Sequence, residues 1–361
     1  MQEHDINPET PLLINEQDKD IKKNELNPNF SFDKLIKDED LKNEEEQLIK
    51  QCNDEADLNL FEVQTANEAI KMAMAQPDPV QLYPPLVLEN EITICFADTG
   101  AGKTALAFQM AIAIASKGYT TLYLDLELSL KQFQRRYTSS DGTPYELPNN
   151  LYRAGFARLN KTPKNESYID CFFRSLIALI KKAGARVIFL DNLTKLAASD
   201  TDTAKATIPI IERLNVLKND YGLTIIVLEH NKKVGTDRPI QLNDLQGSKM
   251  KSNLVDAVFT IGRSANDKNI RYIKQLKVRD GEVIYDTENV KVCELSKDKG
   301  YLSFIEISYG SEFEHLTQPT KENNQILIEQ AKELKNSGKT QREISRAIGR
   351  SLGWVNKHLK K

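Results

Sequence analysis

The fold is decided by the stretch ITICFADTGAGKT, residues 92–104. Its first five residues form a short apolar strand, and the next eight match the phosphate-binding pattern G-x-x-x-x-G-K-[ST], with alanine in the first place. Gly100 and Gly102 let the backbone turn its N–H groups toward an anion, and the following helix presents its positive N-terminal end to that anion. The octet consists of Ala97, Asp98, Thr99, Gly100, Ala101, Gly102, Lys103 and Thr104. We therefore predict that these residues bind a nucleoside triphosphate, taken to be ATP.

Two oxygen ligands for a metal ion accompany this loop. Lys103 is expected to reach the β- and γ-phosphates, and Thr104 to ligate Mg²⁺. Residues 187–191 read Val-Ile-Phe-Leu-Asp, an apolar strand that ends in a carboxylate and fits a Walker B element. We predict that Asp191 holds Mg²⁺ through a water molecule, which makes ATP and Mg²⁺ the expected ligands.

Hydrolysis also needs a group that orients or deprotonates the attacking water. Asn192 follows Asp191, so the base must come from elsewhere in the chain. Glu127 follows the apolar strand of residues 121–126, and parallel strands bring their carboxyl ends to the ligand-binding edge of a sheet. We expect Glu127 to be the base; the alternative is a solvated glutamate at the end of a strand.

Strand and helix patterns alternate from residue 86 to residue 230. Residues 103–116 form a helix that is apolar on nearly every side and therefore buried. Short apolar strands that alternate with helices predict an α/β fold, with a mainly parallel sheet covered by helices on both faces. Further strands joined by polar turns predict an antiparallel extension, at residues 258–261, 270–278, 283–285, 290–295 and 301–307.

Charge divides the chain into parts. Residues 1–60 hold 17 Asp/Glu against 7 Lys, too polar a composition to offset the entropy of folding. We predict a largely disordered acidic arm over residues 1–64, which either docks a protein partner, mimics DNA or only solvates the chain. An ATPase domain over residues 65–309, a linker over residues 310–322 and a small helical module over residues 323–361 follow.

The last 40 residues have the pattern of a helix-turn-helix. Residues 340–343 form a capping box, Gly349 ends the helix that it begins, and a last helix starts near Leu352. Residues 321–361 hold 10 Lys/Arg against 4 Glu, a balance that suits duplex DNA. The expected contacts are Arg350, Ser351, Trp354 and Lys357. The alternative is a small protein-docking module.

Several classes of protein are excluded. The longest apolar run, residues 105–115, is interrupted by Gln109 and is too short to span a membrane. The acidic, polar N-terminus does not have the pattern of a signal peptide. None of the four cysteines lies at metal-ligand spacing. We therefore expect a cytoplasmic protein with reduced thiols and no membrane partner.

Four sequence blocks resemble the RecA-fold hexameric helicases, which include the bacterial replicative helicases and the plasmid-encoded RepA-type helicases; the RepA type is the closer comparison. LDLELS at residues 124–129, followed by QFQRR at 132–136, is similar to their second motif, and DNLTK at 191–195 to their Walker B block. VLEHNKK at 227–233 is similar to their γ-phosphate sensor strand, and residues 242–263 to the loop and strand that follow. The resemblance extends over about residues 66–307.

This resemblance implies further roles and a ring. His230 would sense the γ-phosphate, whereas the alternative is a surface histidine. Lys277 and Arg279 would enter the active site of a neighbouring subunit of a homo-hexamer, with Arg279 as an arginine finger; the alternative is a solvated strand face. Single-stranded DNA would pass through the ring and contact Lys249 and Lys251.

Three functions remain open at this point. The first is a DNA-stimulated ring ATPase that works as a helicase or helicase-like motor in replication or mobilisation of a mobile element. The second is an ATP-gated DNA-binding regulator or loader that does not unwind DNA. The third is a scaffold that binds nucleotide without hydrolysing it. The third is disfavoured by the presence of Lys103, Thr104, Glu127 and Asp191 together.

Overall fold

The computed structural model describes residues 63–139, 141–156, 166–196, 203–232, 235–246, 248–297, 300–317 and 321–359, without the side chains of 203–206, 248–249 and 321–323. The chain divides into two compact units, Met1–Pro77 and Asp78–Lys361. The described part of the first unit contains the helix α2 (Ala66–Met74), which begins with a capping box formed by Thr65 and Glu68. The expected ATPase domain started at residue 65, but α2 belongs to the first unit. Most of the acidic arm lies outside the described residues.

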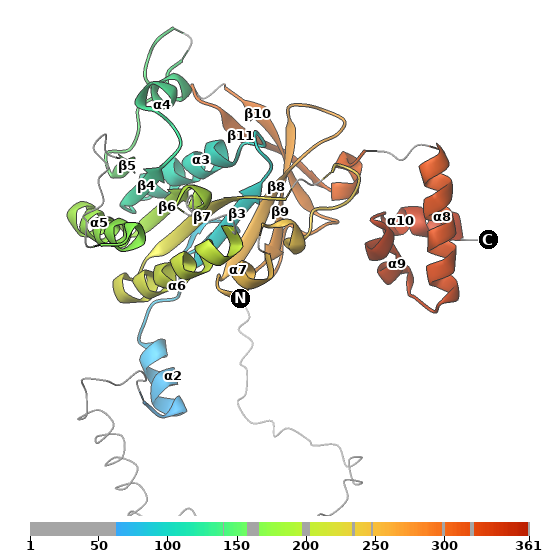
Figure 1. The fold of residues 1–361 in the computed structure, drawn as a ribbon, viewed down its shortest axis with the longest axis horizontal. Helices are drawn as coiled ribbons and strands as arrows, with labels where there is room; N and C mark the ends of the chain where they lie inside the picture. Colours follow the sequence, from blue (N-terminus) through green and yellow to red (C-terminus); the bar gives the residue numbers. More distant parts are fainter. Residues whose placement is uncertain are drawn as a thin grey trace, which may run out of the picture. The chain divides into compact units, whose positions relative to one another are not determined.

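The second unit is built on a nine-stranded sheet in the order β11-β10-β9-β8-β3-β7-β6-β4-β5 (Figure 1). The six strands from β8 to β5 are parallel, and β9, β10 and β11 extend the sheet in antiparallel fashion. This confirms the predicted α/β fold with a mainly parallel sheet and an antiparallel extension. The strands are β3 (Ile92–Ala97), β4 (Thr121–Asp125), β5 (Leu151–Ala154), β6 (Val187–Asp191), β7 (Thr224–His230), β8 (Ala257–Arg263), β9 (Ile270–Lys277), β10 (Val290–Ser296) and β11 (Ser303–Gly310). A separate hairpin pairs β1 (Gln81–Tyr83) with β2 (Val87–Leu88).

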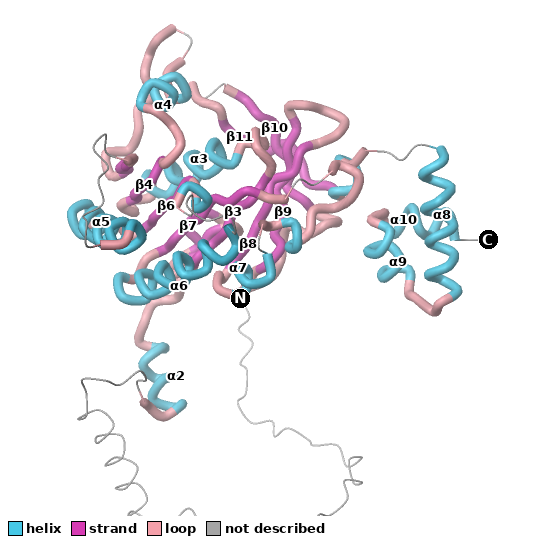
Figure 2. Tube along the Cα trace, viewed as in Figure 1, coloured by secondary structure: helices cyan, strands magenta, loops and turns pink. Residues whose placement is uncertain are grey.

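Helices cover both faces of this sheet (Figure 2). The helix α3 (Lys103–Ser116) packs against one face of the sheet and shares an apolar cluster with it. The helices α5 (Tyr168–Ala183) and α6 (Thr203–Tyr221) share a second cluster with the other face. Side chains of β3 alternate between the two clusters, with Cys95 toward α3 and Ile94 toward α5 and α6. Because β3 is buried on both faces, its end is a rigid base for the loop that follows. Two shorter helices, α4 (Leu130–Arg136) and α7 (Ser248–Asn253), complete this part.

Gln109 is the polar interruption in the otherwise apolar α3. Its amide nitrogen donates to the carbonyl oxygen of Phe304 at 3.1 Å, and its amide oxygen accepts from the Phe304 N–H at 2.7 Å. Phe304 lies in β11, a strand at the edge of the sheet with no neighbour on its outer side. The pair therefore satisfies both backbone groups of one edge residue and fixes β11 against α3.

Two strand predictions were wrong. Residues 283–285 are not a strand, because Gln275 Oε1 accepts the N–H groups of both Ile284 and Tyr285, at 2.8 and 2.9 Å. A side chain here takes the place of a neighbouring strand. The edge strand β5 was not predicted; it has only four residues and no fully buried one, so its sequence carries no clear apolar pattern.

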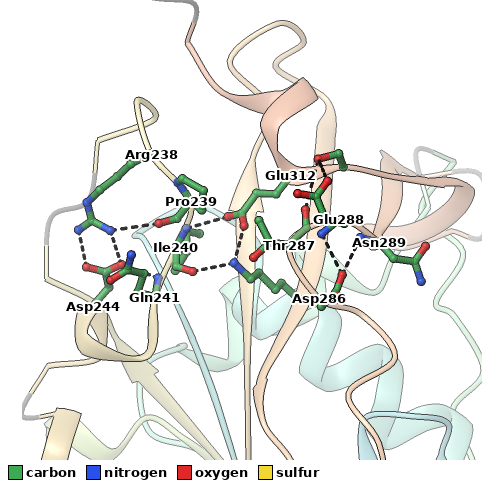
Figure 3. A network of polar contacts seen from close by, with 12 residues as sticks. Arg238, Pro239, Ile240, Gln241, Asp244, Asp286, Thr287, Glu288, Asn289 and Glu312 are labelled. Atoms are coloured by element: carbon green, nitrogen blue, oxygen red, sulfur yellow. Dashed lines mark hydrogen bonds and ion pairs between the residues drawn. The ribbon is translucent and has the colours of Figure 1, made fainter. Parts of the chain in front are cut away.

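The segment predicted as a linker packs in part on the sheet. Residues 312–315 form a 3-10 helix, and the fully buried Glu312 accepts from Lys274 Nζ at 2.5 Å and from the Ile240 N–H at 2.8 Å (Figure 3). Burial raises the pKa of Glu312, while the ammonium of Lys274 opposes that shift. The predicted boundary at residue 309 is therefore corrected, because this buried ion pair makes the following residues part of the core.

Three helices end the chain: α8 (Lys321–Asn336), α9 (Gln341–Ile348) and α10 (Leu352–Leu359). They share a small core of Ala331, Ile344, Val355 and Leu359. The predicted capping box of Thr340 begins α9, and Gly349 ends it in the left-handed conformation. Across the residues described, no helix combines the length and apolarity needed to cross a bilayer.

Candidate functional site

The loop after β3 needs glycine at two positions. Gly100 has φ 74° and Gly102 has φ 105°, both in the left-handed region. A Cβ atom at Gly102 would lie 2.7 Å from Cζ of Phe304, and one at Gly100 would lie 2.9 Å from Nη2 of Arg263. Backbone conformation and close neighbours therefore both select glycine. Within the loop the Ala101 N–H donates to the Asp98 carbonyl oxygen at 3.1 Å; a glycine-rich loop of this kind can turn its other N–H groups toward an anion.

Lys103 begins α3 and points back along the loop. Its side chain is buried, Nζ donates to the carbonyl oxygen of Ala97 at 2.7 Å, and the same atom lies 3.3 Å from Nδ1 of His230. Burial lowers the pKa of Lys103 below its usual value. An ammonium held by one carbonyl and a ring nitrogen keeps bonding capacity for phosphate oxygens.

Asp191 ends β6 as predicted, and its carboxylate oxygen Oδ2 accepts the Tyr123 hydroxyl at 2.8 Å. Burial raises the pKa of Asp191 to about 6; hydrogen bonds from Thr104 and Tyr123 oppose that shift. The hydroxyl of Thr104 and the carboxylate of Asp191 thus lie together. Hard oxygen donors of this kind fit Mg²⁺. The described residues contain no group of three or more His, Cys, Asp or Glu placed to hold a metal by themselves.

Asn192 is a residue of the site for which the sequence predicted no role. Its Nδ2 donates to Glu127 Oε1 at 2.6 Å and lies 3.2 Å from Nε2 of His230. It therefore joins the predicted base to the predicted sensor. The signal was present in the sequence, because Asn192 directly follows Asp191, but the position was considered only as a missing base.

Glu127 is positioned by a neighbouring ion pair. Asp125, at the end of β4, pairs with Arg153 of β5 at 2.9 Å and accepts the N–H of Leu128 at 2.9 Å. Arg153 in turn donates to the Leu128 carbonyl oxygen at 2.7 Å. Two buried or nearly buried charges thus fix both backbone groups of the residue next to Glu127. The unpredicted strand β5 supplies one of them.

His230 ends β7 between two hydrogen-bond donors. Burial lowers the pKa of His230, and the Lys103 ammonium lowers it further. A neutral imidazole has one acceptor nitrogen, so at any moment it accepts either from Lys103 or from Asn192. His230 therefore touches the phosphate-binding lysine and, through Asn192, the base.

The prediction that Lys251 contacts DNA was wrong. Lys251 is fully buried in α7, and Nζ lies 3.1 Å from Oε2 of Glu229. Glu229 also accepts the Thr194 hydroxyl at 2.9 Å. A buried lysine needs a buried carboxylate, and here the neighbour of His230 supplies it. The backbone of Lys249 belongs to α7, and its side chain is outside the described residues.

Lys277 and Arg279 lie far from the nucleotide loop of their own chain. Arg279 pairs with Asp256 at 2.7 Å, and Asp256 accepts the N–H of Ile92, the first residue of β3. Lys277 Nζ donates to the carbonyl oxygens of Ser252 and Val255. The P-loop follows the other end of β3, which at about 3.3 Å per residue lies roughly 20 Å away. Neither side chain can complete this chain's own site.

The loop residues open on a pocket of about 440 Å³. Beside the predicted residues, its lining includes two arginines of α4 and one lysine after β10. Arg135, Arg136 and Lys297 were not predicted to line it; the arginines appeared in the sequence only as part of a motif block. Their charge adds to the attraction of this pocket for a polyphosphate.

The four residues expected to read duplex DNA lie at the start of α10 or on it. Ser351 accepts the Trp354 N–H at 3.1 Å and so caps the helix. Trp354 packs on His358 with ring centroids 4.2 Å apart. Arg350 is partly buried and Lys357 is exposed. Of the four, Lys357 has the most open side chain, and DNA contact by this group stays a prediction.

The chain is similar to known proteins at the level of a family domain and of a solved structure. Residues 59–236 match the protein family described as AAA domain, a span that includes residues 97–104, Glu127, Asp191 and His230 and ends before Lys277. A search of curated proteins found no match. Among solved structures, the chain is similar to a KaiC-like protein of the hyperthermophilic archaeon Pyrococcus horikoshii OT3, with TM-score 0.45 and 15% identity over 60% of this chain and 90% of that one.

Proposed function

We propose that this chain, an ATPase with a RecA-like P-loop core, works on DNA as a ring-forming helicase or helicase-like motor. The observation that carries the proposal is the position of Arg279. It lies at the edge of the sheet where β3 begins, whereas the P-loop lies where β3 ends. An arginine placed there can complete an ATP site only on a neighbouring copy of the chain.

The chemistry assigned to the chain's own residues follows from their contacts. Lys103 and the backbone N–H groups of the loop bind the β- and γ-phosphates, and Thr104 with Asp191 would hold Mg²⁺, which neutralises charge on the phosphates when bound. Glu127 takes the proton of the attacking water. In this conformation Asn192 occupies one of its carboxylate oxygens, so Glu127 has a defined resting orientation.

His230 links that orientation to the nucleotide. It lies 3.3 Å from Lys103 and 3.2 Å from Asn192. A γ-phosphate that draws Lys103 away from His230 leaves the imidazole to accept from Asn192 through Nε2. A shift of Asn192 toward His230 would lengthen its hydrogen bond to Glu127 and free that carboxylate oxygen for water. In this proposal, His230 senses whether a triphosphate is bound.

DNA as the substrate rests on the helicase resemblance and on the basic C-terminal helices. Residues 321–361 carry 10 Lys/Arg against 4 Glu, and Lys357 is exposed. With Lys251 buried, Lys249 is the one of the two lysines predicted to contact single-stranded DNA that remains for it. Because so little positive charge is left for that contact, an ATP-gated DNA-binding regulator or loader stays the second candidate.

Two assays separate these functions. Strand displacement on a forked duplex, run beside DNA-stimulated ATP turnover, should show unwinding that requires ATP. Stimulated turnover without unwinding would contradict the helicase proposal and favour the regulator.

Mixing variants tests the arginine in trans. Arg279→Ala and Glu127→Gln subunits should each be inactive alone and recover partial turnover when mixed, because some interfaces then pair an intact Arg279 with an intact Glu127. The control replaces the second partner with the Glu127→Gln/Arg279→Ala double variant, which cannot restore any interface. If the first mixture is as inactive as this control, Arg279 does not act in trans.

A further inference from the structure

Two arginines face each other on the antiparallel pair β8 and β9. Arg263 and Arg271 are direct cross-strand partners, so their side chains leave the same face of the sheet. Like charges in that arrangement destabilise a sheet. Arg271 is also buried, which with the charge of Arg263 lowers the pKa of Arg271. Such a costly pairing calls for a reason beyond strand stability.

The partners of both guanidinium groups are backbone carbonyls. Arg271 Nε donates to the Ala101 carbonyl oxygen at 3.1 Å, and its Nη1 donates to those of Lys268 and Ile270, each at 2.8 Å. Arg263 Nη2 donates to the carbonyl oxygen of Thr99. In the described part of the chain neither arginine forms an ion pair with a carboxylate; the negative charge acting on Arg271 is that of Asp267, so both guanidinium groups leave positive potential at the loop.

The two carbonyls belong to the peptides that precede the two loop glycines. The Thr99–Gly100 and Ala101–Gly102 peptide bonds are trans, so in each the C=O and the N–H point in opposite directions. A donor that holds the Thr99 oxygen outward turns the Gly100 N–H to the other side. Arg271 does the same to the Gly102 N–H through Ala101.

We propose that Arg263 and Arg271 are positioning residues that orient the P-loop N–H groups and add positive potential for ligands with two or more linked phosphates. The two arginines contact the loop on the side of its carbonyl oxygens, opposite the side to which the Gly100 and Gly102 N–H groups point. A nucleoside monophosphate, which lacks the β- and γ-phosphates that the loop N–H groups bind, gains little from them. The proposal rests on the assignment of this loop as the ATP site.

Binding measured by calorimetry with the full chain and Mg²⁺ tests the pair, with ADP, inorganic pyrophosphate and AMP as probes. Arg263→Gln and Arg271→Gln should each raise the Kd for ADP and pyrophosphate about tenfold, the loss typical of one charged hydrogen bond. The AMP Kd should change less than twofold. At saturating ATP the kcat of Arg263→Gln should stay near that of the wild type while KM rises.

Lys268→Gln is the matched control. Lys268 is exposed and lies in the same hairpin, and the substitution removes the same unit of positive charge. The Lys268 side chain donates to no P-loop carbonyl in the described structure. This control should alter each Kd less than twofold. Arg263 is exposed, so its variant keeps the test valid even if the buried Arg271→Gln fails to fold.

Three results would overturn the proposal. If Arg263→Gln binds ADP and pyrophosphate as tightly as Lys268→Gln, the arginine does not shape the loop. If the variant loses as much affinity for AMP as for ADP, the substitution disturbs the whole site and not the binding of linked phosphates. A wild-type chain that binds none of the three probes would overturn the ATP site itself, and the proposal with it.

Discussion

The buried pair of Lys251 and Glu229 gives a sharp test of the structure, because the sequence placed Lys251 on a DNA-binding surface. We expect Lys251→Met to lower the free energy of unfolding by about 3–5 kcal/mol, the usual cost of leaving one partner of a buried ion pair alone. The side chains are 1% and 2% exposed, so water cannot replace the lost partner. The Thr194 hydroxyl still bonds Glu229, which favours the lower end of that range.

Urea unfolding followed by circular dichroism measures this loss. The double variant Glu229→Leu/Lys251→Met should recover most of it, since two apolar side chains leave no buried charge. Lys268→Met, an exposed lysine replaced in the same way, should stay within about 0.5 kcal/mol of the wild type.

Two outcomes refute the reasoning. If Lys251→Met unfolds at the same urea concentration as Lys268→Met but binds single-stranded DNA more weakly, Lys251 faces solvent and the DNA-binding interpretation is correct. If Lys251→Met is destabilised and the double variant Glu229→Leu/Lys251→Met is no more stable, the two side chains are buried without being paired.

Two further predictions concern the loop and the opposite edge of the sheet. Gly102→Ala should cost roughly 1–2 kcal/mol in backbone strain alone and weaken ADP binding, because φ is 105° and the methyl group would press on Phe304; unchanged binding by calorimetry would contradict the required conformation. Burial, with Asp256 and Asp280 nearby, raises the pKa of Glu91 to about 7, against the counter-effect of Lys218 and Arg279. The folded state therefore binds the Glu91 proton more tightly, and the free energy of unfolding should fall as pH rises from about 4.5 to 7, by on the order of 2 kcal/mol. Urea titrations of Glu91→Gln should lack that part of the slope; an identical slope in the variant would count against it.

The parallel half of the fold could be predicted because local signals agree there. The apolar strand at residues 92–96, the two glycines and the apolar helix that follows are consecutive in the chain, so one short window holds the whole phosphate loop. Asp191 and Glu127 each follow an apolar strand, and parallel pairing brings such ends together. The same rule, applied to Asn192, would have placed it between Glu127 and His230.

The remaining errors come from contacts between distant residues. Lys251 has a sequence environment typical of an exposed basic loop; only packing against Glu229, 22 positions away, buries it. Gln275 satisfies the backbone N–H groups of Ile284 and Tyr285, so no strand forms where the apolar run of residues 283–285 predicts one. Glu312 has the sequence environment of a polar linker residue, and only its contact with Lys274, which is distant in the sequence, pairs its charge in the core. Side chains that replace backbone partners leave no periodic trace in a sequence.

The most direct test of the central claim is steady-state ATP hydrolysis with Mg²⁺ by the wild type and by Glu127→Gln, together with the ADP affinity of each. The exposed Glu282→Gln serves as the charge-matched control. We predict that Glu127→Gln loses turnover by a factor of about 10² or more while its Kd for ADP stays within twofold of the wild type, because Glu127 acts on water and not on the bound phosphates. Turnover by Glu127→Gln equal to that of Glu282→Gln would contradict the claim that Glu127, oriented by Asn192, is the base of this site.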